Sequence, residues 1–255
     1  MRFFYFILVF SLTLATAQSA KTNKSSIKLD TITTYLQDKK QIATQYSVRA
    51  GTNVREGFYQ SFYPSGKLAH QGSYQNGEQE AMWESFFENG KIWKKCSFSK
   101  GLEHGLCAEW DENGVQRSES HFKDGEFEGK KILWNALGQK ESEENWHNKR
   151  LHGTSRVWRD TVLMRELNYH EGHLHGINKI YWPNGKLKTE MPFEHAQVHG
   201  TMRAFDQLGN KILEVEHFKG AKHGVSRRWD NGMLIEDQVW ELDVCKKGCP
   251  EDEKK

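Results

Sequence analysis

The stretch Gly176-Ile177-Asn178-Lys179-Ile180-Tyr181-Trp182-Pro183-Asn184-Gly185-Lys186-Leu187 decides the fold of this chain, because its pattern recurs along most of the sequence. An aromatic residue stands five positions after the first glycine, and an Asn-Gly step occupies positions eight and nine. An Asn-Gly step allows the positive backbone φ that a two-residue hairpin turn needs. The stretch therefore predicts two antiparallel strands joined by a tight turn.

The first residue of this pattern, which we call the anchor, recurs at intervals of 24 residues, with one interval of 23. The eight anchors are Gly57, Ala81, Gly105, Gly129, Gly153, Gly176, Gly200 and Gly224. Self-similarity at a fixed period of this length is the signature of a repeat protein. We therefore expect an all-β fold, an elongated single-layer antiparallel sheet of about eight 24-residue β-hairpin repeats with degenerate caps.

Two aromatic positions recur in phase with the anchors. Position 5, which we call the aromatic ladder, is occupied by Phe62, Phe86, Trp110, Trp134, Trp158, Tyr181, Phe205 and Trp229. A second aromatic follows near position 17, at Tyr74, Phe98, Phe122, Trp146, Tyr169, Phe193 and Phe218. If the Asn-Gly step forms the tip of the first turn, paired positions sum to 17. The anchor then faces the second aromatic, whose ring can lie over a residue without a side chain.

The aromatic position, the Asn-Gly-Lys turn and a Gly-x-x-His-Gly link between units together resemble the MORN-repeat variant family of bacteria. The link occurs at 101–105, 172–176 and 220–224, and the resemblance covers about 57–240. It implies successive hairpins and a binding role, because family members are filed as antitoxin-like and eukaryotic relatives as membrane-, lipid- or protein-binding scaffolds. The sequence departs from the pattern at the anchor Ala81 and at the residue after the ladder aromatic in five units, namely Asp111, Asn135, Arg159, Asp206 and Asp230.

The first 17 residues predict a secretory signal peptide. Met1 and Arg2 precede an apolar run that is too short to span a bilayer, and Ala15-Thr16-Ala17 supplies small residues for cleavage before Gln18. We therefore expect export, to the periplasm, the cell surface or the medium. Export argues against an antitoxin that acts on a cytosolic toxin.

The remaining sequence divides by its pattern into four parts. We expect a polar linker over 18–32, a degenerate N-terminal cap hairpin over 33–56, eight MORN-like repeats over 57–240 and a charged tail with two cysteines over 241–255. The fifth unit has lost its turn glycine at 159–162, which predicts a local irregularity. The eighth unit is expected to lack its second half.

Two pairs of cysteines predict disulfides in an exported chain. Cys96 and Cys107 would be directly opposed in the hairpin register, at a separation that a disulfide can bridge. Cys245 and Cys249 would close a small loop in the tail, for which a redox pair or half of a zinc site are the alternatives.

Five histidines directly precede an anchor: His104, His152, His175, His199 and His223. Equivalent residues two strands apart are ~9.5 Å apart, which excludes a shared ion among them, so we expect a turn-stabilising role. A pH-responsive surface is the alternative. The cluster His170, His173 and His175 is a weak candidate for a metal site, because a turn also gathers polar residues without a metal. We predict no metal and no cofactor.

Composition and motifs favour binding over catalysis. The chain has 36 basic and 34 acidic residues, a balance that argues against a nucleic-acid partner. It contains no phosphate loop and no nucleophile elbow, so no catalytic residue is predicted and the chain is not expected to be an enzyme. The leading hypothesis is an exported scaffold that binds an unidentified protein or an envelope surface through the aromatic ladder.

Several alternatives stay open. The ladder can also pack only against its own sheet. A carbohydrate- or cell-wall-binding array is the second functional hypothesis, since sugars stack on rings beside polar groups such as those at position 3 on the same face. These neighbours are Gln60, Glu84, Arg156, Lys179, Arg203 and Arg227. An antitoxin-like binder of a partner protein is the third, and open sheet edges allow an edge-to-edge homodimer.

Overall fold

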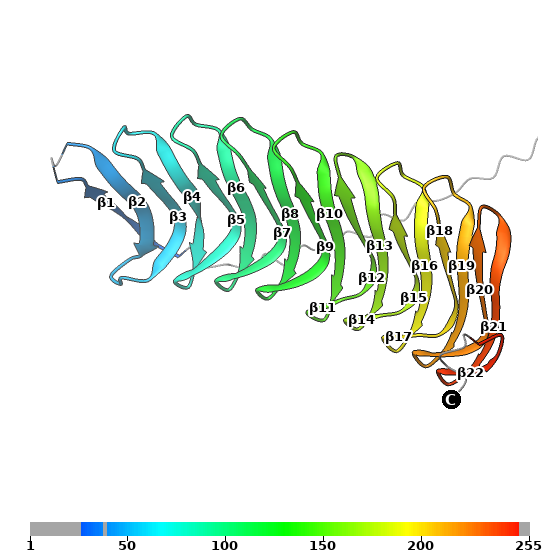
Figure 1. Ribbon diagram of the computed structural model, residues 1–255. Helices are drawn as coiled ribbons and strands as arrows, with labels where there is room; N and C mark the ends of the chain where they lie inside the picture. The colour runs from blue at the N-terminus through cyan, green and yellow to red at the C-terminus, as the bar shows by residue number, and fades with distance from the viewer. Residues whose placement is uncertain (1–26, 38–39, 250–255) are drawn as a thin grey trace, which may run out of the picture.

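A computed structural model describes residues 27–37 and 40–249, and these residues form one antiparallel sheet of 22 strands (Figure 1). The expected signal peptide, most of the expected linker and residues 250–255 lie outside the described residues. Successive strands run side by side along a bowed, elongated array, from β1 at one end to β21 and β22 at the other. The fold is therefore the all-β repeat sheet that the 24-residue pattern predicts.

The strands have the following bounds. They are β1 Leu29–Tyr35, β2 Ile42–Arg49, β3 Arg55–Phe62, β4 Leu68–Gln75, β5 Glu78–Phe86, β6 Ile92–Ser99, β7 Leu102–Trp110, β8 Gln116–Lys123, β9 Glu126–Trp134, β10 Lys140–His147, β11 Arg150–Leu151, β12 Gly153–Arg159, β13 Val162–His170, β14 His173–Leu174, β15 Gly176–Tyr181, β16 Leu187–Glu194, β17 Gln197–Val198, β18 Gly200–Phe205, β19 Lys211–Phe218, β20 Ala221–Asp230, β21 Met233–Glu241 and β22 Val244–Lys247.

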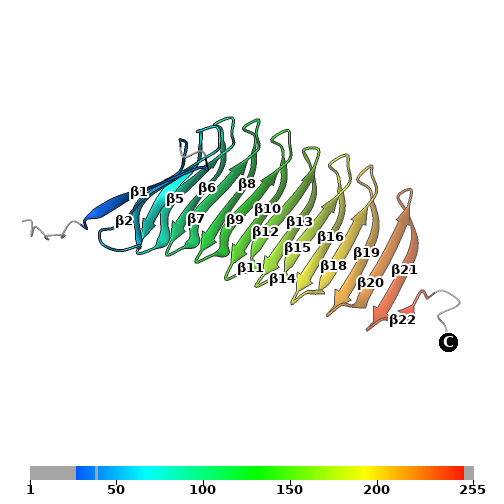
Figure 2. The same ribbon diagram turned by 90° about the vertical axis from the view of Figure 1, so that its left-hand side faces the viewer.

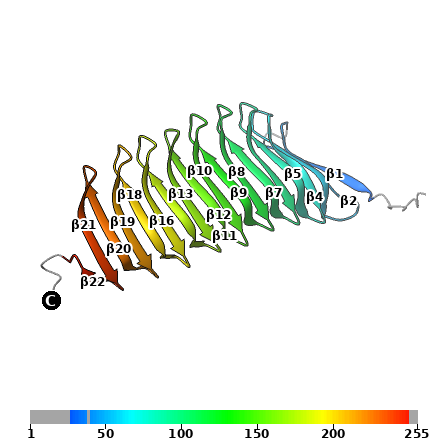
Figure 3. The ribbon, with the colours of Figure 1, turned by 90° about the vertical axis from the view of Figure 1, so that its right-hand side faces the viewer.

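The sheet is a single layer. Side views show strands next to one another with no second layer of described chain over either face (Figures 2 and 3). Burial is accordingly sparse, and the largest side chains below 2% exposure are Asn178 and Cys96. The described part of the chain contains no helix with the length and apolarity needed to cross a membrane. Stability therefore comes from contacts between neighbouring strands rather than from a deep core.

The first turn of a regular unit is a three-residue loop, which differs from the expected two-residue turn. In the second unit the Phe87 and Gly90 amides donate to the carbonyls of Lys91 and Phe87, both at 2.8 Å. Gly90 has a φ of 85°, whereas Asn89 is not in the positive-φ region and its Oδ1 instead accepts the Lys91 amide at 2.9 Å. The glycine closes a bulged loop of the kind common in three-residue hairpins.

The second turn is the two-residue turn, with positive φ at both residues. Asn76 and Gly77 have φ values of 53° and 87°, between the paired residues Gln75 and Glu78. The fifth unit uses this shorter turn for its first turn as well, with φ values of 49° at Asp160 and 70° at Thr161. This is the expected irregularity, and the residue it saves explains the single 23-residue interval.

The anchor faces the second aromatic, as the register predicts. The pairs include Gly57 with Tyr74, Ala81 with Phe98 and Gly105 with Phe122. Gly200 is the exception, because it pairs with His217 and not with Phe218.

The predicted reason for glycine at the anchor is wrong. A Cβ on Gly105 would meet Ser97 of the preceding strand at 3.5 Å, not the ring of its paired aromatic. Every glycine anchor instead has a φ between 72° and 105°. The anchors lie where the register shifts, as between Cys96 and Phe98, so glycine is needed for the backbone of a bulge.

The two ends of the sheet differ from their expected boundaries. The N-terminal cap is the hairpin β1–β2, which begins at Leu29, inside the expected linker, and pairs Leu29 with Arg49. The eighth unit has its second strand, because β21 pairs with β20 and brings Trp240 opposite Gly224. The expectation of an incomplete last unit is therefore wrong. The short strand β22 follows within the expected tail and pairs with β21.

Candidate binding surfaces

The aromatic ladder consists of half-buried rings that contact neighbouring side chains. The Nζ atom of Lys140 lies 5.6 Å from the ring centre of Trp158, and that of Lys211 lies 4.3 Å from the ring centre of Trp229. The ladder is thus a regular series of partly accessible rings, two of which are already covered by a lysine of the same chain.

A row of alternating charge runs beside the ladder across the C-terminal half of the sheet. This charge row consists of Glu143, Arg156, Glu166, Lys179, Glu190, Arg203, Glu214, Arg227 and Asp237, each paired with the next across adjacent strands. Lys140 and Lys211 connect it to the ladder, since their Nζ atoms also lie 2.7 Å from Glu143 and 3.0 Å from Glu214. The ladder and the charge row therefore share one face, which we call the ladder face.

Short ion pairs join several neighbours in the charge row. Arg203 bridges two strands, with Nη1 2.9 Å from Glu190 and Nε 3.2 Å from Glu214. A hydrogen bond from Lys211, followed by one from Arg203, lowers the pKa of Glu214 against the opposing effect of burial. Hydrogen bonds that Arg203 donates to Glu190 and Glu214 raise the pKa of its guanidinium. The contacts therefore favour the charged forms of both Glu214 and Arg203.

Sequence reasoning placed the basic half of this row on the ladder face but missed the acidic half. The signal was partly available, because an acidic residue stands at position 14 in four of the eight units, and positions 3 and 14 sum to the predicted 17. Glu166 and Asp237 stand one position earlier, at position 13.

An aromatic cluster on the opposite face was also missed. It joins Tyr46, Tyr59, Tyr74, Trp83 and Phe98 through ring-centre distances of 5.1–6.4 Å. Trp83 adjoins Glu84 of the ladder face and pairs with Cys96, so it points to the other side of the sheet. The Arg55 guanidinium carbon lies 5.0–5.5 Å from the centres of three tyrosine rings.

Close packing of this cluster depends on Gly72. A Cβ there would collide with the Trp83 ring, whose Nε1 donates to the Ser73 carbonyl at 3.0 Å. A groove of about 430 Å³ lies beside the cluster, and its lining includes Tyr74, Trp93 and the hydrogen-bonded pair His70 and Ser85.

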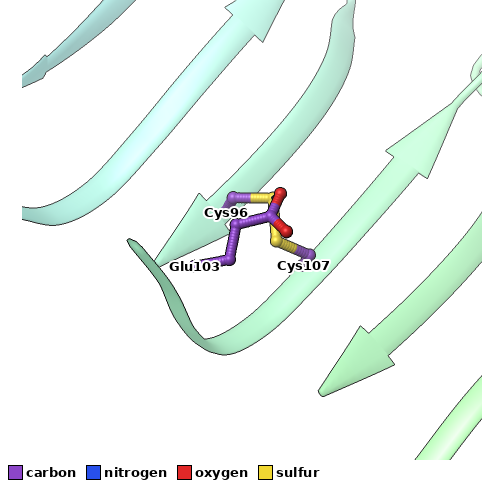
Figure 4. A group of neighbouring side chains, drawn as sticks. All are labelled: Cys96, Glu103 and Cys107. Atoms are coloured by element: carbon purple, nitrogen blue, oxygen red, sulfur yellow. A yellow bond between two sulfur atoms is a disulfide. The ribbon is translucent and has the colours of Figure 1, made fainter. Parts of the chain in front are cut away.

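Both expected cysteine pairs are joined in the structure. Cys96 and Cys107 are directly opposed in the β6–β7 register, with an S–S distance of 2.00 Å, and Glu103 lies beside them (Figure 4). Within the described residues these three side chains also form a cluster of metal-ligand type. The disulfide leaves neither sulfur as a thiolate, which is the form that binds a metal. Cys245 and Cys249 form the second disulfide.

The residue before the anchor stabilises a turn in several units. Glu56, Glu80 and Glu128 each accept the backbone amide of a positive-φ turn residue, at 2.9–3.0 Å. His104 contacts the side chain of a turn residue instead of its backbone amide, since its Nδ1 lies 3.3 Å from Asp124 Oδ1. The later histidines instead contact rings of the neighbouring strands, which a turn-stabilising role alone does not explain. His152 and His175 contact His170, whereas His199 and His223 contact Phe218.

The weak metal candidate lies at a groove on the sheet edge. His170, His173 and His175 line it together with His195, and its volume is about 570 Å³. In the structure, the ligand nitrogens of His170, His173 and His175 do not all lie within 4.8 Å of one another.

The sequence profile of the MORN repeat variant family matches residues 55–76, 79–100 and 174–195. The chain is therefore a repeat protein that carries MORN-type repeats. No curated protein matches it. A solved structure titled "Crystal Structure of TcdB2-TccC3" is similar at 10% identity and a TM-score of 0.18, over 89% of this chain and 16% of the other. A match at that score carries no argument about function.

Proposed function

We propose that this protein is a non-enzymatic, exported scaffold that binds a partner protein or an envelope surface through its ladder face. The observation that carries the proposal is the eightfold recurrence of a half-buried aromatic on a sheet face that no second layer of the described residues covers. Aromatic side chains provide contact area at low entropic cost, and they are enriched at protein interfaces.

The charge row supports a protein partner in particular. Its alternating signs would require a matching alternation on the partner, and electrostatic complementarity of this kind contributes specificity. Export rests on the signal peptide expected over residues 1–17. A partner is therefore sought in the envelope or the medium, and an antitoxin-like role requires an exported toxin.

Binding fits the site geometry better than catalysis does. A catalytic site holds reacting groups in a concave site from which water is excluded. The two grooves described above lie on an open, single-layer sheet. MORN-type repeats are also generally binding modules rather than enzymes.

Cross-linking capture with the chain from Gln18 onward, applied to envelope and medium fractions, tests the proposal. We expect one partner in near-equal amount that is lost when Trp110 and Trp134 of the ladder are changed to serine. Trp93→Ser is the matched control, because this tryptophan is 43% exposed but lies outside the ladder. Capture that survives the ladder substitutions, or fails equally with the control, would exclude the ladder face as the binding surface.

A carbohydrate- or wall-binding role is the second candidate, and the groove beside the aromatic cluster favours it. Trp93 and Tyr74 offer rings there beside the polar pair His70 and Ser85, which suits stacking and hydrogen bonding to a sugar. In the same capture, recovery of peptidoglycan or polysaccharide that Trp93→Ser abolishes would support this role. Recovery that is insensitive to Trp93→Ser would count against it.

A further inference from the structure

Four histidines form a continuous row across successive strands at one edge of the sheet. His147 ends β10, His152 lies between β11 and β12, His170 ends β13, and His175 lies between β14 and β15. Their ring centres are separated by 5.7, 5.1 and 5.7 Å. The row follows the lower edge in Figure 1, where the short strands β11 and β14 lie.

The shortest of these separations matches that of two imidazoles that share a metal ion. With metal–nitrogen bonds of ~2.0–2.1 Å and a ring nitrogen ~1.1 Å from the ring centre, two imidazoles on one tetrahedral ion have centres ~5 Å apart. The pair His152 and His170 has this spacing. The two-strand separation that excludes a shared ion among the histidines before the anchors does not apply here, because His147 and His170 occupy the intervening strands.

The hydrogen bonding of the row leaves ligand nitrogens available. His152 Nδ1 is buried and has no hydrogen-bond partner. Both ring nitrogens of His147 are engaged, since Nδ1 lies 2.7 Å from Glu128 Oε1 and Nε2 lies 3.1 Å from Asn148 Nδ2, so His147 is not counted as a ligand. Neutral imidazole is the commonest protein metal ligand and suits zinc, copper and nickel.

The adjoining groove supplies access and further donors. His170 belongs both to the row and to the lining of the 570 Å³ groove. His173 is exposed and lies opposite His170 across the Glu171-Gly172 turn, so a change of rotamer can bring a third imidazole to the same ion. The groove opens to solvent, which gives a hydrated ion an entry path.

We propose that this histidine row is a binding site for a divalent transition-metal ion, with His152 and His170 as the central pair and His173 as the third ligand. The site is independent of the ladder face, and its function does not depend on the scaffold proposal. A metal site also accounts for the contacts between imidazoles in the fourth and fifth units, which turn stabilisation does not explain.

The chain contains its own matched control. His199, Phe218 and His223 form an equivalent row with ring centres 5.2 and 5.8 Å apart, but a phenyl ring occupies the middle position. His170→Phe therefore converts the proposed site into the phenyl arrangement while retaining a ring for packing. Phe218→His makes the reverse change at the central pair only, because Ala221 lies opposite residue 218 where His173 lies opposite His170.

Equilibrium dialysis of the folded, disulfide-bonded chain against micromolar ZnCl₂ at pH 7.5, followed by elemental analysis, tests the proposal. We expect one zinc per chain, a tenfold or greater loss of affinity in His170→Phe, and no second zinc in Phe218→His, which lacks a third ligand. Zinc should also raise the unfolding temperature of the wild type but not of His170→Phe. Circular dichroism establishes that both variants fold. Equal zinc in the wild type and His170→Phe, or no zinc in either, would overturn the proposal.

Discussion

At the scale of single residues, the anchor is governed by backbone conformation. Ala81 is the one anchor with a side chain, and it has a φ of 60°. The left-handed conformation costs a residue with a Cβ about 1–2 kcal/mol, whereas glycine adopts it freely. The sequence alone shows Ala81 only as a departure from the anchor pattern, whereas the structure identifies it as a strained position.

We predict that Ala81→Gly raises the free energy of unfolding by about 0.5–1 kcal/mol, since relief of the backbone cost exceeds the added entropy of the unfolded chain. Urea denaturation measures the change. Gly105→Ala is the reciprocal control and should destabilise by about 1 kcal/mol or more, because its new Cβ has room but its φ of 91° is unfavourable. A loss of stability in Ala81→Gly would contradict this account.

Gly72 is required for a different reason, because its lack of a side chain makes room for the Trp83 ring. We predict that Gly72→Ala destabilises the chain by about 1–3 kcal/mol through overpacking and displaces the tryptophan. A shift in tryptophan fluorescence should accompany the change in urea midpoint. Gly90→Ala separates crowding from backbone strain, since a Cβ at Gly90 meets nothing within 4 Å. If both variants shift fluorescence equally, crowding is not the cause.

At the scale of strands and turns, the period, the hairpin register and the opposed cysteines could be predicted because each depends on local spacing. The assignment of turn types could not. An Asn-Gly step fits both a two-residue turn and the end of a three-residue loop, and the choice depends on the twist of the flanking strands. The second turn keeps its two-residue form even with His195-Ala196, whose φ values are 49° and 64°.

The candidate sites were predicted less completely than the strands, for a related reason. The ladder follows from one recurring position, whereas the charge row and the histidine row each combine two positions on neighbouring strands. His152 and His170 belong to different units and become adjacent only when the link between units is folded. The shortened first turn of the fifth unit also shifts the count of positions in that unit by one.

The charge row should make stability depend on pH in the acid range. The folded pKa of Glu214 is lowered from an ordinary value of 4.5, so its contribution is present above that value and is lost as the pH falls through the folded pKa. We predict that Arg203→Met costs about 0.5–1 kcal/mol at pH 7 and progressively less below pH 4.5. Thermal unfolding across this range measures the difference.

Arg117→Met is the control for this substitution, since its ion pair with Asp111 is looser, at 3.7 Å, and lies outside the charge row. It should change stability little at any pH. A cost of Arg203→Met that stays constant down to pH 3 would show that lost packing, and not charge, is responsible.

The disulfide between β6 and β7 should stabilise the sheet locally. Closing a loop between residues 11 positions apart is worth about 2–3 kcal/mol in the chain-entropy description. We predict that the double substitution of Cys96 and Cys107 by serine lowers the free energy of unfolding by about this amount. Guanidinium denaturation without reductant measures it. The same loss from substitution of Cys245 and Cys249 would show a general effect of disulfides and not one specific to this hairpin link.

At the scale of the whole molecule, each unit contacts mainly its neighbours, so complete units should be separable from the rest. We predict that deletion of 176–199, which joins His175 to Gly200 and so restores the link between units, leaves a folded sheet. Small-angle scattering should show an array about 10 Å shorter, since two strand spacings are lost. Deletion of 176–187 is the control, because removal of one strand reverses the direction of the next.

The open sheet also sets the distance between equivalent side chains along the molecule. Equivalent side chains on the ladder face recur every second strand, or about every 10 Å. Their orientation changes gradually from unit to unit because the array is curved. A ligand that spans several units must therefore present its own contacts at that interval. Gain or loss of a 24-residue segment would change the reach of the molecule in steps of this size without altering the chemistry of any one contact. The number of repeats would then set the length of ligand that the protein can contact.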